Sequence, residues 1–459
     1  MGLQTTARAE KHYSPKFGSI VAVMAATVGV IYGYDNGSIS GALPFLTKQY
    51  HLTPALQGAV TSTAVLGSII GAVFGGRIAD TIGRKKMMLL IALGFTVFAL
   101  FSAVPVGIWW LLPVRFCIGL CIGASVVAAP LFIAEFAPAK IRGSLLVSYQ
   151  IAQTIGIIAA NFIDFGFSFS GNWELMLGIS CIPAFLVTLA LIPFPDTPRW
   201  YLMKGRREKG IETLQKIEPP DNVASELAKI DEELKMNEGR FREIFQKRFL
   251  KAAIFVIVFG FLVQITGINA IVYYAPIIFK TIGLATSTSI LSAAIIQVSS
   301  LLAELISFFL VDRWGRRPTL LTGIGAMVMS SLVMAVLFFA GHFDGAGIYL
   351  AFLSVLVFNM GFNFGMGSLV WIYASECFPA RLRAAGASAL LTADLIANFV
   401  VAQVFISALH AFGGGWTFFV FMILSLAAWF FIFILAPETK GRSLEEIHNY
   451  WDNGGSWNK

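Results

Sequence analysis

The sequence predicts an all-α membrane protein whose spanning helices form two homologous halves. Of the 459 residues, 57% are hydrophobic and only 13% are charged, whereas a soluble domain carries about 25% charged residues. Each membrane-spanning helix needs ~20 mostly apolar residues, and such stretches recur along the whole chain. Three charged motifs also occur twice, in the same order and with nearly equal separations. Duplicated motifs in an apolar chain indicate a duplicated set of helices.

The apolar stretches predict twelve spans, six on each side of one long polar segment. They are residues 17–43, 56–76, 87–105, 109–134, 143–165, 174–194, 252–278, 287–310, 318–340, 347–375, 384–408 and 415–436. With both termini in the cytoplasm, all but three of the 33 Lys and Arg residues fall in cytoplasmic segments, the exceptions being Lys48, Arg115 and Lys280. Cytoplasmic loops carry such an excess. The net charge of +7 is therefore interpreted as a topology signal and not as a nucleic-acid surface.

The long polar stretch, residues 195–251, predicts a cytoplasmic linker. Leu227, Ile230 and Leu234 have helical spacing, which predicts short amphipathic helices. A disordered linker is the alternative, because Pro219-Pro220 interrupts the pattern. The predicted parts are a cytoplasmic segment (1–16), a six-helix half (17–194), the helical linker (195–251), a second six-helix half (252–436) and a cytoplasmic tail (437–459).

The sequence lacks the patterns typical of an enzyme. It has no nucleophile–base pair and no Gly-rich phosphate loop, and its five His are scattered. Cys117 and Cys121 share a helix face, but a metal site needs more ligands than these two. We interpret the four cysteines as small apolar packing residues. We therefore predict no enzymatic activity, no cofactor and no bound metal.

The repeated motifs put acids beside bases at the ends of spans. Asp-x-x-Gly-Arg at 80–84 returns at 312–316, Glu…Pro…Arg at 135–142 returns at 376–383, and Pro-Asp-Thr at 195–197 returns as Pro-Glu-Thr at 437–439. Topology alone requires the bases but not the acids. We therefore predict a cytoplasmic latch of ion pairs that opens and closes, with a role in topology alone as the alternative. Its predicted members are Asp80, Arg84, Glu135, Arg142, Asp312, Arg313, Arg316, Glu376 and Arg383.

Together these motifs resemble the sugar porter family of the major facilitator superfamily. The resemblance also rests on Arg115-Phe116-x-x-Gly119, on Gly267-Ile268-Asn269 followed by Tyr273-Tyr274, and on the closing Pro-Glu-Thr-Lys-Gly. It covers nearly the whole chain, from about Gly33 to Gly441. The resemblance implies the major facilitator fold, with twelve transmembrane helices in two six-helix halves, a substrate site between the halves and a helix broken near Gly267.

Asp35 and Arg115 are unlike charges within the first and fourth predicted spans. Charges at membrane depth are costly, so they usually pair and usually have a function. If the guanidinium moves away during transport, the acid can take up a proton, so we predict that this pair couples transport to protons. Proton-coupled members of the family resemble this chain at both positions, whereas facilitative members usually carry Asn where Asp35 stands. A static ion pair is the alternative.

Amide and aromatic side chains within the spans predict a site for a polyhydroxy substrate, because amides both donate and accept hydrogen bonds. By resemblance, Gln150, Gln264, Asn269 and Trp371 match sugar-contacting positions, and Tyr273 with Tyr274 matches the extracellular gate. The predicted substrate-binding residues are Gln150, Gln153, Gln264, Asn269, Tyr273, Ser300, Asn363, Gly367, Trp371, Asp394 and Asn398. Amides in membranes also join helices, which is the alternative for Gln153, Asn363 and Asn398.

Departures from the family's usual residues leave the substrate open. Asp394 stands where Asn or Gln is common, and we predict that it binds either the substrate or a second proton. A residue that is only hydrogen-bonded within its helix or to a neighbour is the alternative. Ser300 stands where an Asn often contacts sugar. Gly365-Met366-Gly367-Ser368 lacks the prolines common in the tenth helix. Hexoses, pentoses and polyols are therefore all candidate substrates.

These features predict a secondary active transporter that imports a sugar or polyol with a proton by alternating access. A passive uniporter on the same fold is the alternative, and a membrane sugar sensor is disfavoured because the C-terminal tail is short. We expect a multi-pass protein of a bacterial cytoplasmic (inner) membrane with both termini in the cytoplasm. Its expected partners are the substrate, the proton and membrane lipid, with no nucleic acid, and we expect it to act as a monomer.

Overall fold

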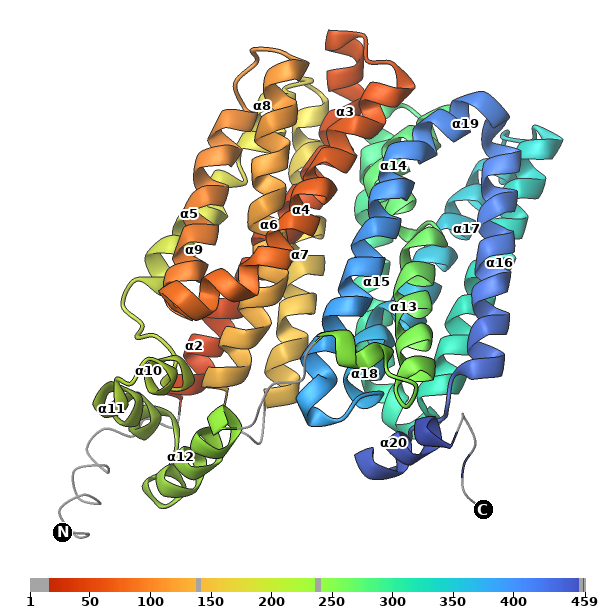
Figure 1. The fold of residues 1–459 in the computed structure, drawn as a ribbon. Coiled ribbons are helices and arrows are strands. Elements are labelled where there is room, and N and C mark those ends of the chain that lie inside the picture. The colour runs from red at the N-terminus through yellow and green to blue at the C-terminus, as the bar shows by residue number, and fades with distance from the viewer. Residues whose placement is uncertain (1–15, 138–141, 236–240, 454–456, 458–459) are drawn as a thin grey trace. The chain divides into compact units, whose positions relative to one another are not determined.

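A computed structural model of the chain describes residues 16–137, 142–235, 241–453 and 457 (Figure 1). Every element within these residues is helical. The elements are α2 (Phe17–Ala26), α3 (Val28–Tyr50), α4 (Pro54–Ile82), α5 (Arg84–Ser102), α6 (Ile108–Phe136), α7 (Arg142–Ser168), α8 (Trp173–Gly178), α9 (Cys181–Leu191), α10 (Pro198–Met203), α11 (Arg207–Ile217), α12 (Pro220–Lys235), η1 (Phe241–Phe245), α13 (Leu250–Ile265), α14 (Ile268–Thr281), α15 (Thr286–Trp314), α16 (Arg316–Ala340), α17 (Ala346–Phe362), η2 (Asn363–Gly367), α18 (Ser368–Glu376), η3 (Ala380–Leu382), α19 (Arg383–Leu435) and α20 (Leu444–Asp452).

Eleven helical stretches among the described residues are long and apolar enough to cross a membrane. The longest, α19, has 53 residues, or about 80 Å at 1.5 Å per residue, whereas the hydrocarbon core is ~30 Å thick. Gly413 interrupts it with φ 77° and ψ 165°, and the ribbon turns over within α19 (Figure 1). Since α19 therefore supplies two spans, the prediction of twelve spanning helices in an all-α protein is confirmed.

Several spans are interrupted within their length. Gly267, with φ 102°, separates α13 from α14, so the break expected near this residue is present. The segment between α17 and α18 is a π-helix, Asn363–Gly367. Thus a π-helical turn lies within the tenth predicted span. Such turns occur often at functional sites.

The polar linker contains the helices α10, α11 and α12, so the amphipathic helices predicted for it are present. Pro220 is the first residue of α12, a position where proline is favoured because its missing N–H would have no helical partner. The Pro219-Pro220 pair therefore begins a helix instead of disordering the segment. Arg207 and Asp231 join α11 to α12 at 2.8 Å. Residues 236–240 of the predicted linker lie outside the described residues.

The chain divides into two compact units, each described here by itself. Unit 1 comprises residues 1–35, 66–160 and 174–237, and unit 2 comprises residues 36–65, 161–173 and 238–459. Buried aromatic side chains, among them Phe95, Phe132 and Phe136, fill the core of unit 1. The division predicted from the sequence has its boundaries at residues 16, 194, 251 and 436, because it follows the sequence repeat. That division stays a prediction.

Small residues let helices approach closely in both units. In unit 1, a Cβ at Gly71 of α4 would lie 2.2 Å from the Leu120 carbonyl oxygen of α6. In unit 2, a Cβ at Gly58 would lie 2.4 Å from the Gln403 carbonyl oxygen of α19. Helices in membranes associate through such backbone proximity, because hydrophobic contact alone gives little advantage over lipid.

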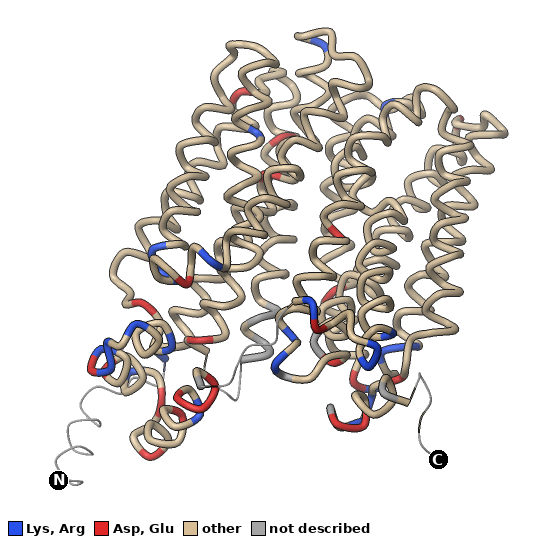
Figure 2. The backbone as a smooth tube through the Cα atoms, in the orientation of Figure 1, with Lys and Arg blue, Asp and Glu red and all other residues tan. Residues whose placement is uncertain are grey.

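Charged residues gather at one end of each unit (Figure 2). In unit 1 this end carries α10, α11 and α12, and in unit 2 it carries α20. Few charges lie along the remaining length of the helices, which is the distribution expected of segments that cross a membrane.

The close approach of α4 and α6 predicts different outcomes for two glycines on α4. Gly71→Ala should force the helices apart and lower the Tm of the detergent-solubilised protein, because overpacking costs about 1–3 kcal/mol. Gly76→Ala is the matched control, since its Cβ would meet only the Val127 side chain at 3.5 Å. Thermal denaturation of both variants tests this. Equal Tm values for the two variants would contradict the assigned packing.

Candidate functional site

A buried ion pair joins α3 to α6 within unit 1. Arg115 Nη1 donates to Asp35 Oδ1 at 2.5 Å, and the two residues are 2% and 4% exposed. Losing one partner of a buried pair costs about 3–5 kcal/mol, because the other charge is left uncompensated. The two residues singled out in the sequence are therefore in contact, while their role in proton coupling stays a prediction.

Two glycines allow α7 to lie directly against α3. A Cβ at Gly33 would lie 1.8 Å from the Gln153 carbonyl oxygen, and a Cβ at Gly156 would lie 2.2 Å from the Val30 carbonyl oxygen. The side chains of Gln153 and Gln150 are both partly buried on this helix. Two predicted substrate-binding residues thus lie on the helix that packs closely against the helix of Asp35.

Asp164 is an acid at membrane depth that sequence reasoning missed. It lies in α7, it is 0% exposed, and neither carboxylate oxygen has a hydrogen-bond partner among the described residues. Its Oδ2 occupies the space beside Gly41 of α3, where a Cβ would lie 2.3 Å away. The signal was the one that identified Asp35, an ionisable residue within a predicted span.

A chain of hydrogen bonds connects three predicted substrate-binding residues in unit 2. Gln264 Nε2, near the end of α13, donates to Asp394 Oδ1 of α19 at 2.9 Å. Asn269 Nδ2, in the first turn of α14, donates to Gln264 Oε1 at 2.7 Å. Gly267 makes this possible, because the break it introduces lets residues on both sides face one another. All three polar side chains are partly exposed.

A second polar cluster in unit 2 contains Asn359, which sequence reasoning did not single out. Asn359 Nδ2 donates to Ser300 Oγ of α15 at 2.6 Å. Asn363 Nδ2 donates to Asn359 Oδ1 at 3.2 Å and to its carbonyl oxygen at 2.9 Å. Ser300 and Asn359 are buried, whereas Asn363 is half-buried at the start of η2, which ends at Gly367. This cluster joins two helices and presents one amide, Asn363, at its partly exposed end.

The predicted gate tyrosines are both buried on α14. Asn398 Nδ2 donates to the Tyr273 hydroxyl at 3.4 Å, and the Tyr274 hydroxyl donates to the Ala402 carbonyl oxygen at 2.5 Å. Both bonds tie α14 to α19. Trp371 on α18 is 40% exposed, which leaves its ring available for contact with a ligand.

Arg84 is the centre of the charged cluster in unit 1. Its guanidinium lies 2.7 Å from Asp80 Oδ1 and 3.4 Å from Glu135 Oε1. The Arg84 and Glu135 side chains are 5% and 9% exposed, whereas that of Asp80 is 53% exposed. The charge of Glu135 therefore depends on Arg84 more strongly than the charge of Asp80 does. The side chain of Arg142, another predicted member of the latch, lies outside the described residues.

In both copies, the acid of the third repeated motif caps the helix that begins within the first repeated motif. Asp196 Oδ1 accepts hydrogen bonds from the backbone N–H groups of Arg84 and Lys85 at 3.0 and 3.2 Å. Glu438 does the same at the start of α16, where it accepts two backbone N–H groups at 3.0 Å. Carboxylates at a helix N-terminus satisfy its unpaired donors and its dipole. Burial raises the pKa of the Asp196 carboxyl, and these hydrogen bonds oppose the rise.

The glycine of each Asp-x-x-Gly-Arg motif is required by this cap. Gly83 and Gly315 have φ of 111° and 102°, a conformation that residues with a Cβ rarely adopt. A Cβ would also lie 2.1 Å from Asp196 Oδ2 in the first copy and 2.5 Å from Glu438 Oε2 in the second. The first and third motifs are therefore one structural device formed by two distant segments.

The second copy of the charged cluster, in unit 2, is more open. Arg316 Nη1 lies 3.1 Å from Asp312 Oδ1, and their side chains are 19% and 77% exposed. Burial raises the pKa of the Glu376 carboxyl, and the charges of Arg316 and Arg383 oppose this only in part. Arg313 is exposed and makes no ion pair with a residue that the structure describes. The structure therefore does not bring Arg313 into the predicted latch.

Comparison with known proteins assigns the family. A family profile described as "Sugar (and other) transporter" matches residues 21–451. The galactose-proton symporter of Escherichia coli (strain K12) is 34% identical over 430 residues, which cover 93% of each chain. The arabinose-proton symporter of the same strain is 33% identical and covers 94% of this chain and 93% of its own.

The chain belongs to the sugar transporter family. A solved structure of the xylose transporter XylE from E. coli, in a partially occluded inward-open conformation, matches this family member with a TM-score of 0.82 at 24% identity. The match covers 93% of this chain and 100% of the other. The predicted major facilitator fold is thereby confirmed. This family member is a multi-pass membrane transporter, and because the family consists of transporters, the prediction that it is not an enzyme is confirmed as well.

The buried position of Arg84 predicts a large effect of its removal. Arg84→Leu should lower the Tm of the solubilised transporter by several degrees, because Glu135 loses its buried partner at a cost of about 3–5 kcal/mol. Adding Glu135→Gln should recover part of that loss. The matched control is Arg316→Leu, whose partner is exposed and should contribute no more than ~1 kcal/mol. Thermal denaturation of the four proteins decides this, and an equal loss in both single variants would contradict it.

Proposed function

We propose that this chain is a proton-coupled sugar symporter that works by alternating access. The observation that carries the proposal is the buried ion pair of Asp35 and Arg115. The family supports it, because its members include a galactose-proton symporter and an arabinose-proton symporter that are each at least 33% identical to this chain. Taking up a proton would neutralise Asp35 and weaken its hold on Arg115. A proton can thus change how firmly α3 and α6 are joined.

Coupling to one proton has a useful magnitude. One charge that crosses a membrane potential of ~100 mV gains ~2.3 kcal/mol. At 1.4 kcal/mol for each factor of ten, this corresponds to roughly fifty-fold accumulation of substrate. A single proton-binding carboxyl is therefore sufficient to drive concentrative import.

The substrate class we propose is a sugar: a hexose, a pentose or a related polyol. Gln264 and Asn269 combine donors and acceptors, which suits several adjacent hydroxyl groups, and the exposed Trp371 ring suits the apolar face of a sugar ring. Asp394 accepts a hydrogen bond from Gln264, which supports a role in accepting a substrate hydroxyl as well. Gln150, Gln153, Ser300, Asn363, Gly367, Asn398 and Tyr273 complete the proposed set, and Tyr274 completes the gate with Tyr273.

The proposal includes an orientation and a mode of action. Both termini face the cytoplasm of a bacterial cell, and the charged end of each unit acts there as a latch that must open during transport. The transporter acts as a monomer surrounded by lipid. A passive uniporter is the second candidate, and the acid at position 35 favours the symporter over it.

Removal of the acid tests proton coupling. Asp35→Asn should abolish uptake against a concentration gradient and preserve exchange of labelled for unlabelled sugar, because only the first process needs the proton. Purified protein in vesicles with an imposed pH gradient gives both measurements, and exposed Asp344→Asn is the control. Accumulation by Asp35→Asn at the wild-type level would refute the assignment. If that variant does not fold, Asp35→Asn with Arg115→Gln removes both charges together.

A substrate panel combined with Asp394→Asn tests the proposed cargo. Galactose, arabinose, xylose, glucose and inositol should be compared in the same vesicles. For the best substrate, the KM of Asp394→Asn should rise about tenfold or more, since hydrogen bonds to charged groups contribute about 1.5–3 kcal/mol. Thr392→Ala, on an exposed part of the same helix, is the control. An unchanged KM with a shifted pH profile would identify Asp394 as a proton site instead.

A further inference from the structure

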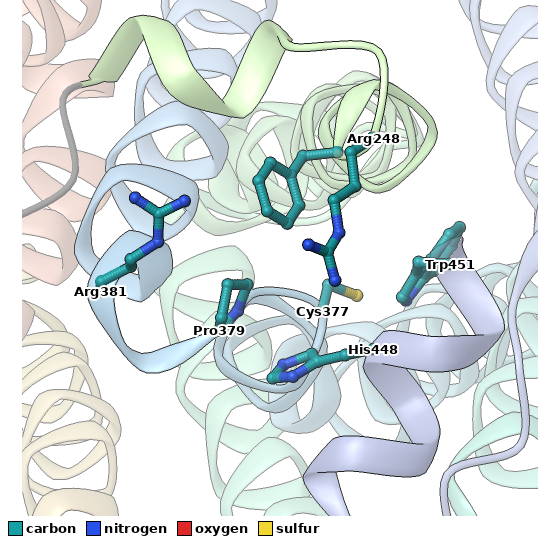
Figure 3. Close-up of a pocket in the computed structure, with 7 residues that line it drawn as sticks. Arg248, Cys377, Pro379, Arg381, His448 and Trp451 are labelled. Atoms are coloured by element: carbon teal, nitrogen blue, oxygen red, sulfur yellow. The ribbon is translucent and has the colours of Figure 1, made fainter. Parts of the chain in front are cut away.

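A small cavity lies at the charged end of unit 2, and its described lining contains none of the residues proposed for transport. Its volume is about 150 Å³. Three separate segments supply its lining: Arg248 from the end of the linker, Cys377 and Arg381 from the segment between α18 and α19, and His448 and Trp451 from α20. Figure 3 shows Arg248 extending toward Cys377 and His448, with Trp451 on one side and Pro379 on the other.

The polar groups that line this cavity are almost all hydrogen-bond donors. Guanidinium and indole groups donate and cannot accept, and an imidazole donates through at least one nitrogen. No carboxylate is among the residues that the structure describes in its lining. Outside the lining, Glu243 Oε2 accepts a hydrogen bond from Arg381 Nη1 at 2.7 Å. A cavity with this composition is complementary to an anion.

Two ring nitrogens of the lining are buried without an oxygen or nitrogen partner among the described residues. They are Nε2 of His448 and Nε1 of Trp451. Trp451 is only 6% exposed, and the group beside its N–H is the Cys377 thiol, a weak acceptor. Leaving a buried donor unsatisfied costs about 1–3 kcal/mol. A bound anion would accept from the Trp451 N–H, and also from His448 when that imidazole carries a proton on Nε2.

Neighbouring aromatic rings hold the donors in place. The Arg248 guanidinium lies over the Phe249 ring at 5.5 Å. The Trp451 ring packs against Phe255 of α13 with centroids 5.1 Å apart. The arrangement is therefore held by the protein's own aromatic rings and does not need the ligand to form it, which lowers the cost of binding.

We propose that this cavity binds a phosphate group, from either a phosphomonoester in solution or the headgroup of an anionic lipid. At about 30 Å³ for each water molecule, its volume corresponds to roughly five waters, which is room for one phosphate group. Arginine supplies the planar donors that match phosphate oxygens. Both possible sources share this chemistry.

Phosphate binding would act on the charged cluster of unit 2. Cys377 directly follows Glu376, and Arg381 lies two residues before Arg383. The helix that carries His448 and Trp451, α20, begins six residues after Glu438, the residue that caps α16. A phosphate that bridges these segments should hold the cluster together and slow transport, a consequence that rests on the proposed function. The binding itself does not.

Binding to the full-length protein tests the site without sugar or a proton gradient. In a zwitterionic detergent, inorganic phosphate and glucose 6-phosphate should raise the Tm above that in chloride at equal ionic strength. Arg248→Gln should weaken the apparent affinity at least tenfold. Arg242→Gln, which removes an exposed arginine outside the cavity, is the matched control and should leave the affinity unchanged. Trp451→Phe keeps the ring, removes the N–H and should weaken binding as well.

A second arm separates the two sources of phosphate. The same proteins in nanodiscs of phosphatidylcholine alone, or with added phosphatidylglycerol, report on a lipid headgroup. A shift only with phosphatidylglycerol, lost in Arg248→Gln, assigns the site to lipid, and a shift with the soluble ligands assigns it to a phosphomonoester. No shift under any condition, or shifts that Arg248→Gln leaves intact, would overturn the proposal. Failure of sugar uptake by the wild-type protein would instead count against the proposed function.

Discussion

The constraint on which the rest of this structure depends is that an arginine removed from water must have an acidic partner, because its guanidinium cannot lose its charge. Among the described residues of unit 1, Arg115 and Arg84 are the buried cations, and each is met by an acid from a different helix. Because an unpaired charge at such a position costs several kcal/mol, these contacts fix how α3, α5 and α6 stand against one another. Glycines then pack two further helices against these, α7 onto α3 and α4 onto α6.

The duplicated motifs share one geometry but differ in burial. In both copies, an acid from the third motif caps the helix that begins at the first, and a glycine with positive φ makes room for it. The arginine that follows is 5% exposed in the first copy and 19% exposed in the second. Exposed ion pairs contribute little because water competes for both charges. The two copies are therefore alike as helix caps and unequal as ion-pair clusters.

The sequence was sufficient for the helices and for the pairing of Asp35 with Arg115, because both follow from the cost of polar groups in an apolar medium. It was less informative where a contact depends on which helices meet. The spacing of Glu135 and Arg142 shows that they can share a face, but the described partner of Glu135 is Arg84 from another helix. Asn359 was missed for a similar reason. The sequence around an amide in an apolar helix does not show whether that amide joins two helices or binds a ligand.

The acid at position 394 determines the direction of the hydrogen bonds that link Asn269, Gln264 and Asp394 in unit 2. A carboxylate only accepts hydrogen bonds, whereas an amide both donates and accepts. Gln264 must therefore turn its N–H₂ toward Asp394, which leaves its oxygen for the N–H₂ of Asn269. With Asn or Gln at position 394, either orientation of the chain would be possible. In this chain the carboxylate selects one orientation of the hydrogen-bond chain. A ligand hydroxyl that reaches Asp394 therefore has to donate its hydrogen bond. In this way a single residue, Asp394, restricts the order of donors and acceptors along the ligand.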